Sequence, residues 1–172
     1  YLSPSEVGIY AVAALLAQTL TLIPSAVQRV TAPATATLYG KGDIRAIRRV
    51  ISSTMRKTFL VSVPIALVLV IFGQFFITLL FTGEFLPAYL PLLALLVGHT
   101  IFAPFMAIGS TLASIGKVNI PFKIHSICGM LNVVLNILLI PLLGIMGAAI
   151  STTVTHIVSF VIHIVVIEKA LS

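Results

Sequence analysis

The sequence predicts an all-α protein: a polytopic transmembrane helix bundle with about five spanning helices. Of its 172 residues, 59% are apolar and only 8% are charged, and long charge-free intervals alternate with short charged segments. A soluble globular domain needs far more polar surface than this composition supplies. The hydrocarbon core of a bilayer is about 30 Å thick, so each crossing needs roughly 20 apolar residues.

The charge-free intervals indicate where the chain crosses the membrane. They lie between residues 57 and 84, between 84 and 117, and between 123 and 168, and Pro141 and Gly144 divide the last of them into two spans. A further helical run precedes the first basic segment. The expected spans are residues 7–39, 59–81, 88–115, 122–140 and 145–167, with a basic loop at 40–58. The chain opens with Tyr-Leu-Ser-Pro and without a start Met, so we expect it to belong to a longer protein.

The first span carries a cation within an apolar helix. As one helix, residues 7–39 would be about 50 Å long, and Pro24 and Pro33 are expected to break it beside a cavity. At helical periodicity, a polar face contains Gln18, Thr21, Ser25, Gln28, Arg29 and Thr35. The opposite face, expected to contact lipid, contains Leu16, Leu20, Ile23, Val27 and Leu38.

Arg29 needs an explanation because a cation within the bilayer is costly and usually functional. One interpretation is contact with an anionic substrate, and the other is that its long side chain reaches the headgroups or forms a structural pair. Gln28 beside it is interpreted either as a packing and hydrogen-bonding residue or as a sugar contact.

The loop expected at residues 40–58 contains six cations. They are Lys41, Arg45, Arg48, Arg49, Arg56 and Lys57. Cytoplasmic loops are enriched in Lys and Arg, so we interpret these residues as topogenic, with a dedicated site for lipid headgroups as the alternative. Apolar residues recur among them at helical spacing, which predicts a helix lying along the membrane surface. The resulting orientation places residue 1 outside and residue 172 in the cytoplasm.

The last three spans contain polar residues at regular intervals. The span at 88–115 combines Pro91 and Pro104 with several hydroxyl residues, which predicts irregular backbone within the protein. Polar or small residues follow the i, i+4, i+7, i+11 spacing in both of the next two helices. The two sets are His125, Gly129, Asn132 and Asn136, and Thr152, His156, Ser159 and His163.

Each of these polar residues has a structural interpretation as well as a functional one. Asn132 and Asn136 could bind substrate, or they could form hydrogen bonds to a neighbouring helix, as amides in membranes often do. His99, His156 and His163 have no acidic partner in the sequence pattern, so neither a metal site nor a proton relay is expected. Cys128 is expected to pack in a helix interface.

Enzymatic activity is not expected. The acidic residues, Glu6, Asp43, Glu84 and Glu168, all lie in loops or at the ends of spans, so no carboxylate pair or activated nucleophile can form within the membrane. The residues indicate no cofactor, no metal and no nucleic-acid partner.

Four stretches, in order along the chain, carry a resemblance to a known family. They are residues 7–13 (VGIYAVA), 33–43 (PATATLYGKGD), 81–85 (FTGEF) and 132–149 (NVVLNILLIPLLGIMGAA). They resemble the carboxy-terminal half of polysaccharide exporters, which are flippases of the multidrug/oligosaccharidyl-lipid/polysaccharide (MOP) superfamily. Thr82 departs from the pattern, because a glycine would be more typical directly after Phe81.

The resemblance implies that the chain supplies helices eight to twelve of a two-lobed, V-shaped transporter, with an N-terminal lobe as its partner. Such a transporter moves a polyprenyl-(pyro)phosphate-linked oligosaccharide across the membrane by alternating access. Arg29 would contact the diphosphate from the cytoplasmic half of its helix. The further candidate substrate residues are Gln28, Gln18, Ser25, Asn132 and Asn136.

Two alternatives to the flippase remain open at this point. One is a multidrug or cation antiporter of the same superfamily, which would need an intramembrane acid that this chain does not supply. The other is a non-transporting membrane scaffold whose basic segment recruits a soluble partner.

Overall fold

The computed structural model describes residues 2–171. Within that range the secondary structure is helical, without strands, and five stretches are long and apolar enough to cross a membrane. They are Pro4–Gly40, Ile44–Leu80, Gly83–Ser114, Asn119–Leu143 and Ile145–Leu171. The predicted all-α bundle with about five spanning helices is confirmed.

The first span consists of α1 (Pro4–Gln18), a 3₁₀ turn η1 (Thr19–Thr21) and α2 (Leu22–Gly40). A capping box joins Ser3 and Glu6 at the start of α1. The 3₁₀ turn precedes Pro24, which has no N–H to donate to the preceding turn, so an α-helix is disfavoured at this point. Pro33 lies inside α2. The expected break therefore occurs at the first proline.

The expected lipid face of the first span is wrong for two of its residues. Leu16 is 6% exposed and Leu20 is 2% exposed, and both belong to a buried apolar cluster that also contains Leu92. Ile23, in contrast, is 42% exposed. Part of the polar face is not buried, because a hydroxyl such as that of Ser25 is satisfied by a carbonyl of its own helix, whereas Thr35 on the same face is 1% exposed. Apolar packing against α4 therefore determines which face of α1 is buried.

The second span, α3 (Ile44–Leu80), also corrects an expected boundary. It is one helix of 37 residues, which corresponds to about 55 Å. Asp43 caps its N-terminus by accepting a hydrogen bond from Ala46 N at 2.9 Å. Ile47 and Ile51 are buried in a second apolar cluster. The residues expected as a basic loop at 40–58 thus lie almost entirely in the first turns of α3, because this segment has an apolar face that packs on the bundle.

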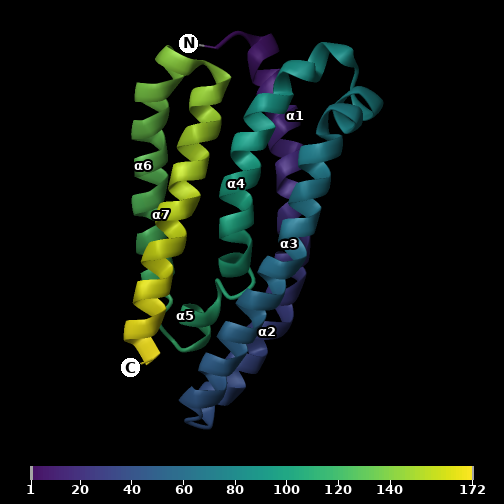
Figure 1. Ribbon diagram of the computed structural model, residues 1–172. Coiled ribbons are helices and arrows are strands. Elements are labelled where there is room, and N and C mark those ends of the chain that lie inside the picture. Colours follow the sequence, from purple (N-terminus) through teal and green to yellow (C-terminus); the bar gives the residue numbers. More distant parts are fainter. Residues whose placement is uncertain (1, 172) are drawn as a thin grey trace.

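The third span is interrupted, as the prolines and hydroxyl residues predicted. A 3₁₀ turn, η2 (Gly83–Ala88), leads into α4 (Tyr89–Met106), and α5 (Thr111–Ser114) follows after a short break. In Figure 1, α4 lies between α6 and α7 on one side and α1 to α3 on the other. It therefore forms the centre of the bundle.

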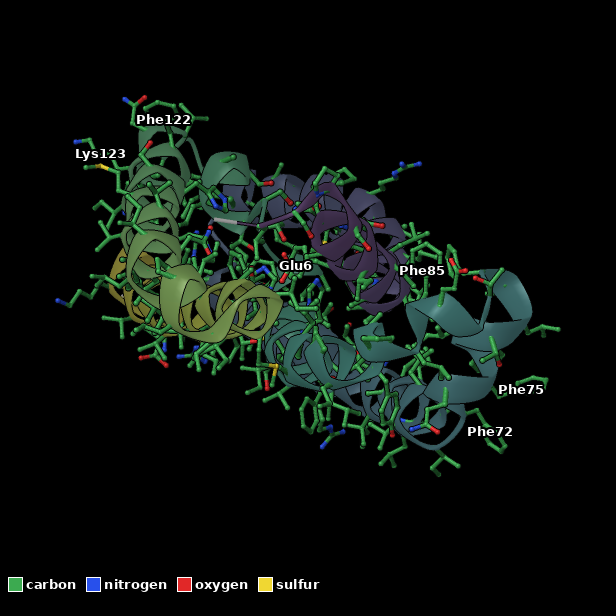
Figure 2. The ribbon with its side chains drawn as sticks, turned by 90° about the horizontal axis from the view of Figure 1, so that it is seen from above. Glu6, Phe72, Phe75, Phe85, Phe122 and Lys123 are labelled. Carbon is green, nitrogen blue, oxygen red and sulfur yellow. The ribbon has the colours of Figure 1, made fainter. Side chains whose placement is uncertain are left out.

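The last two spans, α6 (Asn119–Leu143) and α7 (Ile145–Leu171), form an antiparallel hairpin. Gly144 ends α6 with a φ of 57°, a conformation that side chains rarely adopt. Viewed along the helices, the bundle is elongated, with Lys123 of α6 towards one end and Phe72 and Phe75 of α3 towards the other (Figure 2).

Candidate functional site

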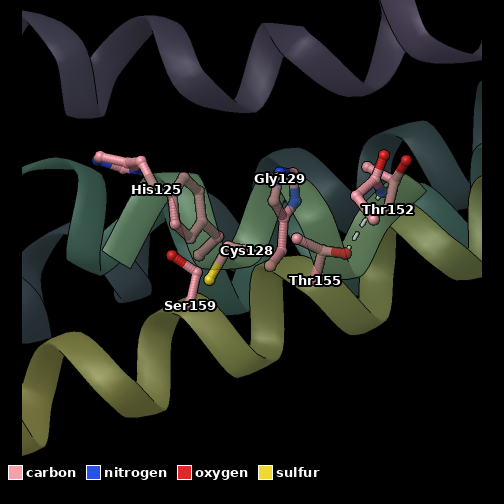
Figure 3. Close-up of a pocket in the computed structure, with 9 residues that line it drawn as sticks. His125, Cys128, Gly129, Thr152, Thr155 and Ser159 are labelled. Atoms are coloured by element: carbon pink, nitrogen blue, oxygen red, sulfur yellow. Dashed lines mark hydrogen bonds between the residues drawn. The ribbon is translucent and has the colours of Figure 1, made fainter. Parts of the chain in front are cut away.

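A polar cavity of about 330 Å³ lies between α4, α6 and α7 (Figure 3). Three members of each of the two sets with the i, i+4, i+7, i+11 spacing, one set on each helix of the hairpin, contribute to its lining. The lining residues are Phe102, His125, Cys128, Gly129, Asn132, Thr152, Thr155, His156 and Ser159. The two stripes meet because consecutive helices of a short-turn hairpin are antiparallel neighbours.

A chain of hydrogen bonds crosses one wall of this cavity. Asn136 Nδ2 donates to Asn132 Oδ1 at 3.0 Å, and Asn132 Nδ2 lies 3.3 Å from Thr155 Oγ1. Thr155 Oγ1 in turn donates to Ser151 O at 2.8 Å. The chain thus joins α6 to α7. Asn136 Oδ1 is buried and has no hydrogen-bond partner among the described residues. One oxygen of this network can therefore still accept a hydrogen bond.

Aromatic rings form the α4 side of the cavity. The ring of Phe102 stacks on that of His156 with centroids 4.6 Å apart, and His99 meets His156 edge-on at 4.7 Å. His156 Nδ1 is buried and has no hydrogen-bond partner within residues 2–171. One ring of the cavity wall therefore presents an unsatisfied nitrogen.

A second histidine pair lies nearer the carboxyl end of α7. The ring centroids of His125 and His163 lie 5.2 Å apart. The ring of His163 also packs against that of Phe105, with 4.0 Å between their centroids. His163 is 0% exposed. Across the part of the chain that the structure describes, no group of three or more His, Cys, Asp or Glu residues is arranged to hold a metal ion.

The structure separates the predicted site residues into two groups. Asn132 and Asn136 belong to the hairpin described above, whereas the predicted residues of the first span do not line that cavity. Gln18 is exposed, and Ser25 Oγ donates to Leu22 O at 2.8 Å. Gln28 packs at the break after α4, where an added Cβ on Gly109 would lie 3.2 Å from its Nε2.

Arg29 lies on an exposed part of α2, eleven residues before Gly40, which is roughly 16 Å along the helix axis. It forms no ion pair and no hydrogen bond with the other described residues. The neighbouring Thr31 faces the protein, where its hydroxyl donates to Ala107 O at 2.7 Å. The guanidinium is therefore available to a group outside this bundle.

The basic residues at the start of α3 have different environments. Arg48 donates from its guanidinium to Leu171 O at 3.1 Å and so caps the carboxyl end of α7, together with Lys117, whose Nζ lies 3.4 Å from Ala170 O. Arg49 lines a shallow surface groove with Ser53 and Thr54. The remaining predicted topogenic cations, Lys41, Arg45, Arg56 and Lys57, are exposed.

Sequence reasoning assigned no site role to the residues that α7 contributes to the cavity. Thr152 and Ser159 belong to an evenly spaced polar set, Thr155 lies outside it, and the sequence predicts neither a metal site nor a proton relay for the histidines. The signal that could have identified them is the identical spacing of polar residues on two helices joined by a short turn. That pattern predicts that the two stripes face one another.

The fold and the polar cavity define a helical integral membrane protein whose bundle encloses polar side chains between its spans. The chain belongs to the lipid II flippase MurJ family, whose model matches residues 1–172. The resemblance to flippases of the MOP superfamily is thereby confirmed.

Curated relatives come from archaea. An uncharacterized membrane protein of Methanocaldococcus jannaschii is 31% identical over 140 residues, which is 81% of this chain and 27% of that protein. The probable low-salt glycan biosynthesis flippase Agl15 of Haloferax volcanii is 26% identical over 163 residues, 95% of this chain and 34% of that protein. The probable flippase AglR of the same organism is 24% identical over 181 residues, 99% of this chain and 36% of that protein. The chain thus spans about a third of its relatives' length, and no solved structure gives a significant match.

Proposed function

We propose that this chain forms part of a flippase that moves a polyprenyl-(pyro)phosphate-linked oligosaccharide across the membrane by alternating access. The observation that carries the proposal is the family match over residues 1–172. Two relatives named as flippases, one of them for glycan biosynthesis, support it. In this proposal the protein is a transporter rather than an enzyme, and membrane lipids and the lipid-linked oligosaccharide are its partners.

Arg29 is the residue that we propose to contact the diphosphate. A guanidinium matches the oxygens of a phosphate with two parallel donors, and such charge-assisted bonds strengthen where water is excluded. The exposure of Arg29 and its lack of a partner among the described residues are consistent with a ligand that approaches from outside this bundle. Passage of the headgroup through hydrocarbon would otherwise strip its hydration without replacement.

The remaining candidates fit this proposal in two places. Gln28, Gln18 and Ser25 accompany Arg29 on the first span and would contact the sugar or the phosphate nearby. Asn132 and Asn136 would offer amide groups from the hairpin. We further propose that an N-terminal lobe faces this bundle across a central cavity. The chain would span a prokaryotic plasma membrane with residue 1 outside the cell and residue 172 in the cytoplasm.

The test uses the full-length protein in a host whose own oligosaccharide flippase has been deleted. Arg29→Ala is expected to reduce glycan export about tenfold or more, because a bidentate charged hydrogen bond contributes roughly 1.5–3 kcal/mol. Arg29→Lys should retain part of the activity, since it keeps the charge without the planar fork. The matched control is Arg45→Ala, which removes another exposed cation and should leave export unchanged.

The two alternative functions predict different outcomes. For a scaffold, Arg29→Ala would leave function intact, whereas the double substitution of Arg45 and Arg49 would abolish it. Arg48 is omitted from that pair because its loss would also uncap α7. For a cation antiporter, the full-length protein would show proton- or sodium-driven efflux of an organic cation and no glycan export.

A further inference from the structure

All four histidines of the chain lie in two ring-contact pairs between α4, α6 and α7. One pair is His99 with His156, and the other is His125 with His163. Their helices are long and apolar enough to span the membrane. An ionisable residue in such a segment is a candidate functional group by default, and neither the family match nor the relatives' names assign these residues a role.

The hydrogen bonds of His163 define its neutral tautomer. Its Nδ1 lies 2.8 Å from Ser159 O, and a carbonyl oxygen can only accept, so Nδ1 carries the proton. The other nitrogen, Nε2, must then hold the lone pair. Nε2 is buried and has no hydrogen-bond partner among residues 2–171. The side chain is thus fixed in one orientation with an unused basic nitrogen, which is the state that can bind a proton.

The neighbours of His163 can accommodate a positive charge. The Phe105 ring lies with its centroid 4.0 Å from that of His163, within the range at which an aromatic ring attracts a cation. The Ser159 carbonyl already accepts from Nδ1, and that bond strengthens when the imidazole is charged. His125 adds a second imidazole 5.2 Å away between centroids and also lines the polar cavity.

The helices of the pair carry further charged groups: Lys123 lies two residues before His125 on α6, and Glu168 lies five residues after His163 on α7. The neighbouring elements add other titratable groups. α4 contributes His99, α6 contributes Cys128 beside His125, and α7 itself contributes His156. α1 contributes Tyr10, whose hydroxyl bonds with Thr152 at 3.2 Å. α5 (Thr111–Ser114) has no titratable residue. A proton on His163 would add one positive charge to this interface.

We propose that His163 and His125 form a proton-binding site inside the membrane-spanning bundle. A proton delivered through the polar cavity adds to the lone pair of His163 Nε2, forming one N–H bond and raising the charge of the site by one. The ring of His125, whose centroid lies 5.2 Å from that of His163, is the second imidazole of the site. Binding of this proton is linked to movement of the substrate, a part of the proposal that rests on the proposed flippase function.

The packing around Phe105 connects the proposed proton site to α2, the helix that carries Arg29. Phe105 lies in the last turn of α4 and belongs to the same apolar cluster as Ile108. The break that follows is bonded to α2 through Thr31 and Ala107 O, and α2 also carries Arg29. A charge that changes how His163 and Phe105 pack therefore acts on the helix that carries the proposed diphosphate contact.

The proton site can be tested on the full-length protein without any substrate. The protein is labelled with ¹⁵N-histidine, reconstituted in phospholipid bilayers, and examined by solid-state NMR between pH 8 and pH 5, with His163→Gln identifying the His163 signal. We expect its Nε2 resonance to change from the unprotonated to the protonated position. His125→Gln should move the midpoint by about one pH unit, as expected for interacting sites, whereas the control His99→Gln, from the other pair, should leave it in place.

The result that overturns the proposal is a His163 Nε2 that remains unprotonated at every pH at which the protein is folded. A midpoint that does not respond to His125→Gln would remove His125 from the site. If His163→Gln fails to fold, His99, His125 and His156 are each replaced by Gln in turn, and the signal that persists in all three variants is assigned to His163.

Transport measurements separate this proposal from the proposed function. If the full-length protein exports the glycan, His163→Gln should abolish the pH dependence of export, and an unchanged pH profile would refute the linkage. If it exports none while His163 titrates as described, the proton site stands and the flippase function fails.

Discussion

Single residues determine how closely the helices approach. Gly98 on α4 lies directly against α7, and a Cβ added at this position would be 2.8 Å from Thr153 Cα. Thr153 Oγ1 also donates to Ala94 O at 2.7 Å. Small residues have this role in membrane proteins because van der Waals packing and interhelical hydrogen bonds, rather than the hydrophobic effect, hold the helices together.

Gly98→Ala is therefore expected to destabilise the bundle. Overpacking of a close contact costs about 1–3 kcal/mol, and here the clash is with backbone, which cannot rotate away. The measurement is the thermal unfolding midpoint of the full-length protein in detergent. Gly129→Ala is the matched control, since nothing lies within 4 Å of a Cβ at that position. Equal midpoints for the two variants would contradict the packing described for Gly98.

At this scale the sequence identified some candidates and missed others. Asn132 was predicted because an amide in a span is conspicuous, and the structure places it in a cavity wall. His163 was expected to be structural because it has no acidic partner in the sequence. The proposed proton site rests on a carbonyl near Nδ1 and an unpartnered Nε2, and both depend on side-chain packing that sequence periodicity does not report.

At the scale of elements, the break after α4 is held by a neighbouring helix. Breaks of this kind persist within membranes where another part of the protein satisfies the freed carbonyls. The Thr31 hydroxyl of α2 does this for Ala107 O at 2.7 Å. The interruption is thus a stable feature of the third span and a point of contact between α2 and α4.

Thr31→Val should weaken this contact. The substitution keeps the shape of the side chain but leaves a carbonyl unsatisfied, which costs about 1–3 kcal/mol when the group is buried. Hydrogen exchange at residues 107–111 should increase relative to the unsubstituted protein. Thr37→Val is the control, because the Thr37 hydroxyl donates to Pro33 O within its own helix. Unchanged exchange in the Thr31 variant would show that other contacts hold the break.

The elements themselves were predictable, whereas several of their ends were not. Charge-free intervals located four of the five spanning stretches, because a bilayer requires a minimum apolar length, and the helical run that contains Arg29 located the first. They misplaced the start of α3, because a helix continues as long as its backbone bonds and apolar face are satisfied, and Ile47 and Ile51 provide that face in the basic segment. Sequence periodicity also did not predict which face of α1 is buried, since that face depends on the helix that packs against it.

At the scale of the whole molecule, the positive charges predict how the bundle sits in the membrane. In a Cys128→Ser background, Lys41→Cys between α2 and α3 should react with an impermeant maleimide only from the cytoplasmic side. Thr82→Cys, which lies at the opposite end of α3, should react only from outside. Intact cells and inside-out vesicles give the two measurements. Labelling of both positions from the same side would contradict the orientation proposed for this chain.

The continuity of α3 has a mechanical consequence. A helix of 37 residues is about 55 Å long, so roughly 25 Å of it exceeds the hydrocarbon thickness. A rotation of α3 by about 10° around one end would displace the other end by roughly 10 Å. Small angular changes among the spans would thus become large displacements at the basic end of α3, where spin labels would report the proposed alternating-access movement as changes in distance.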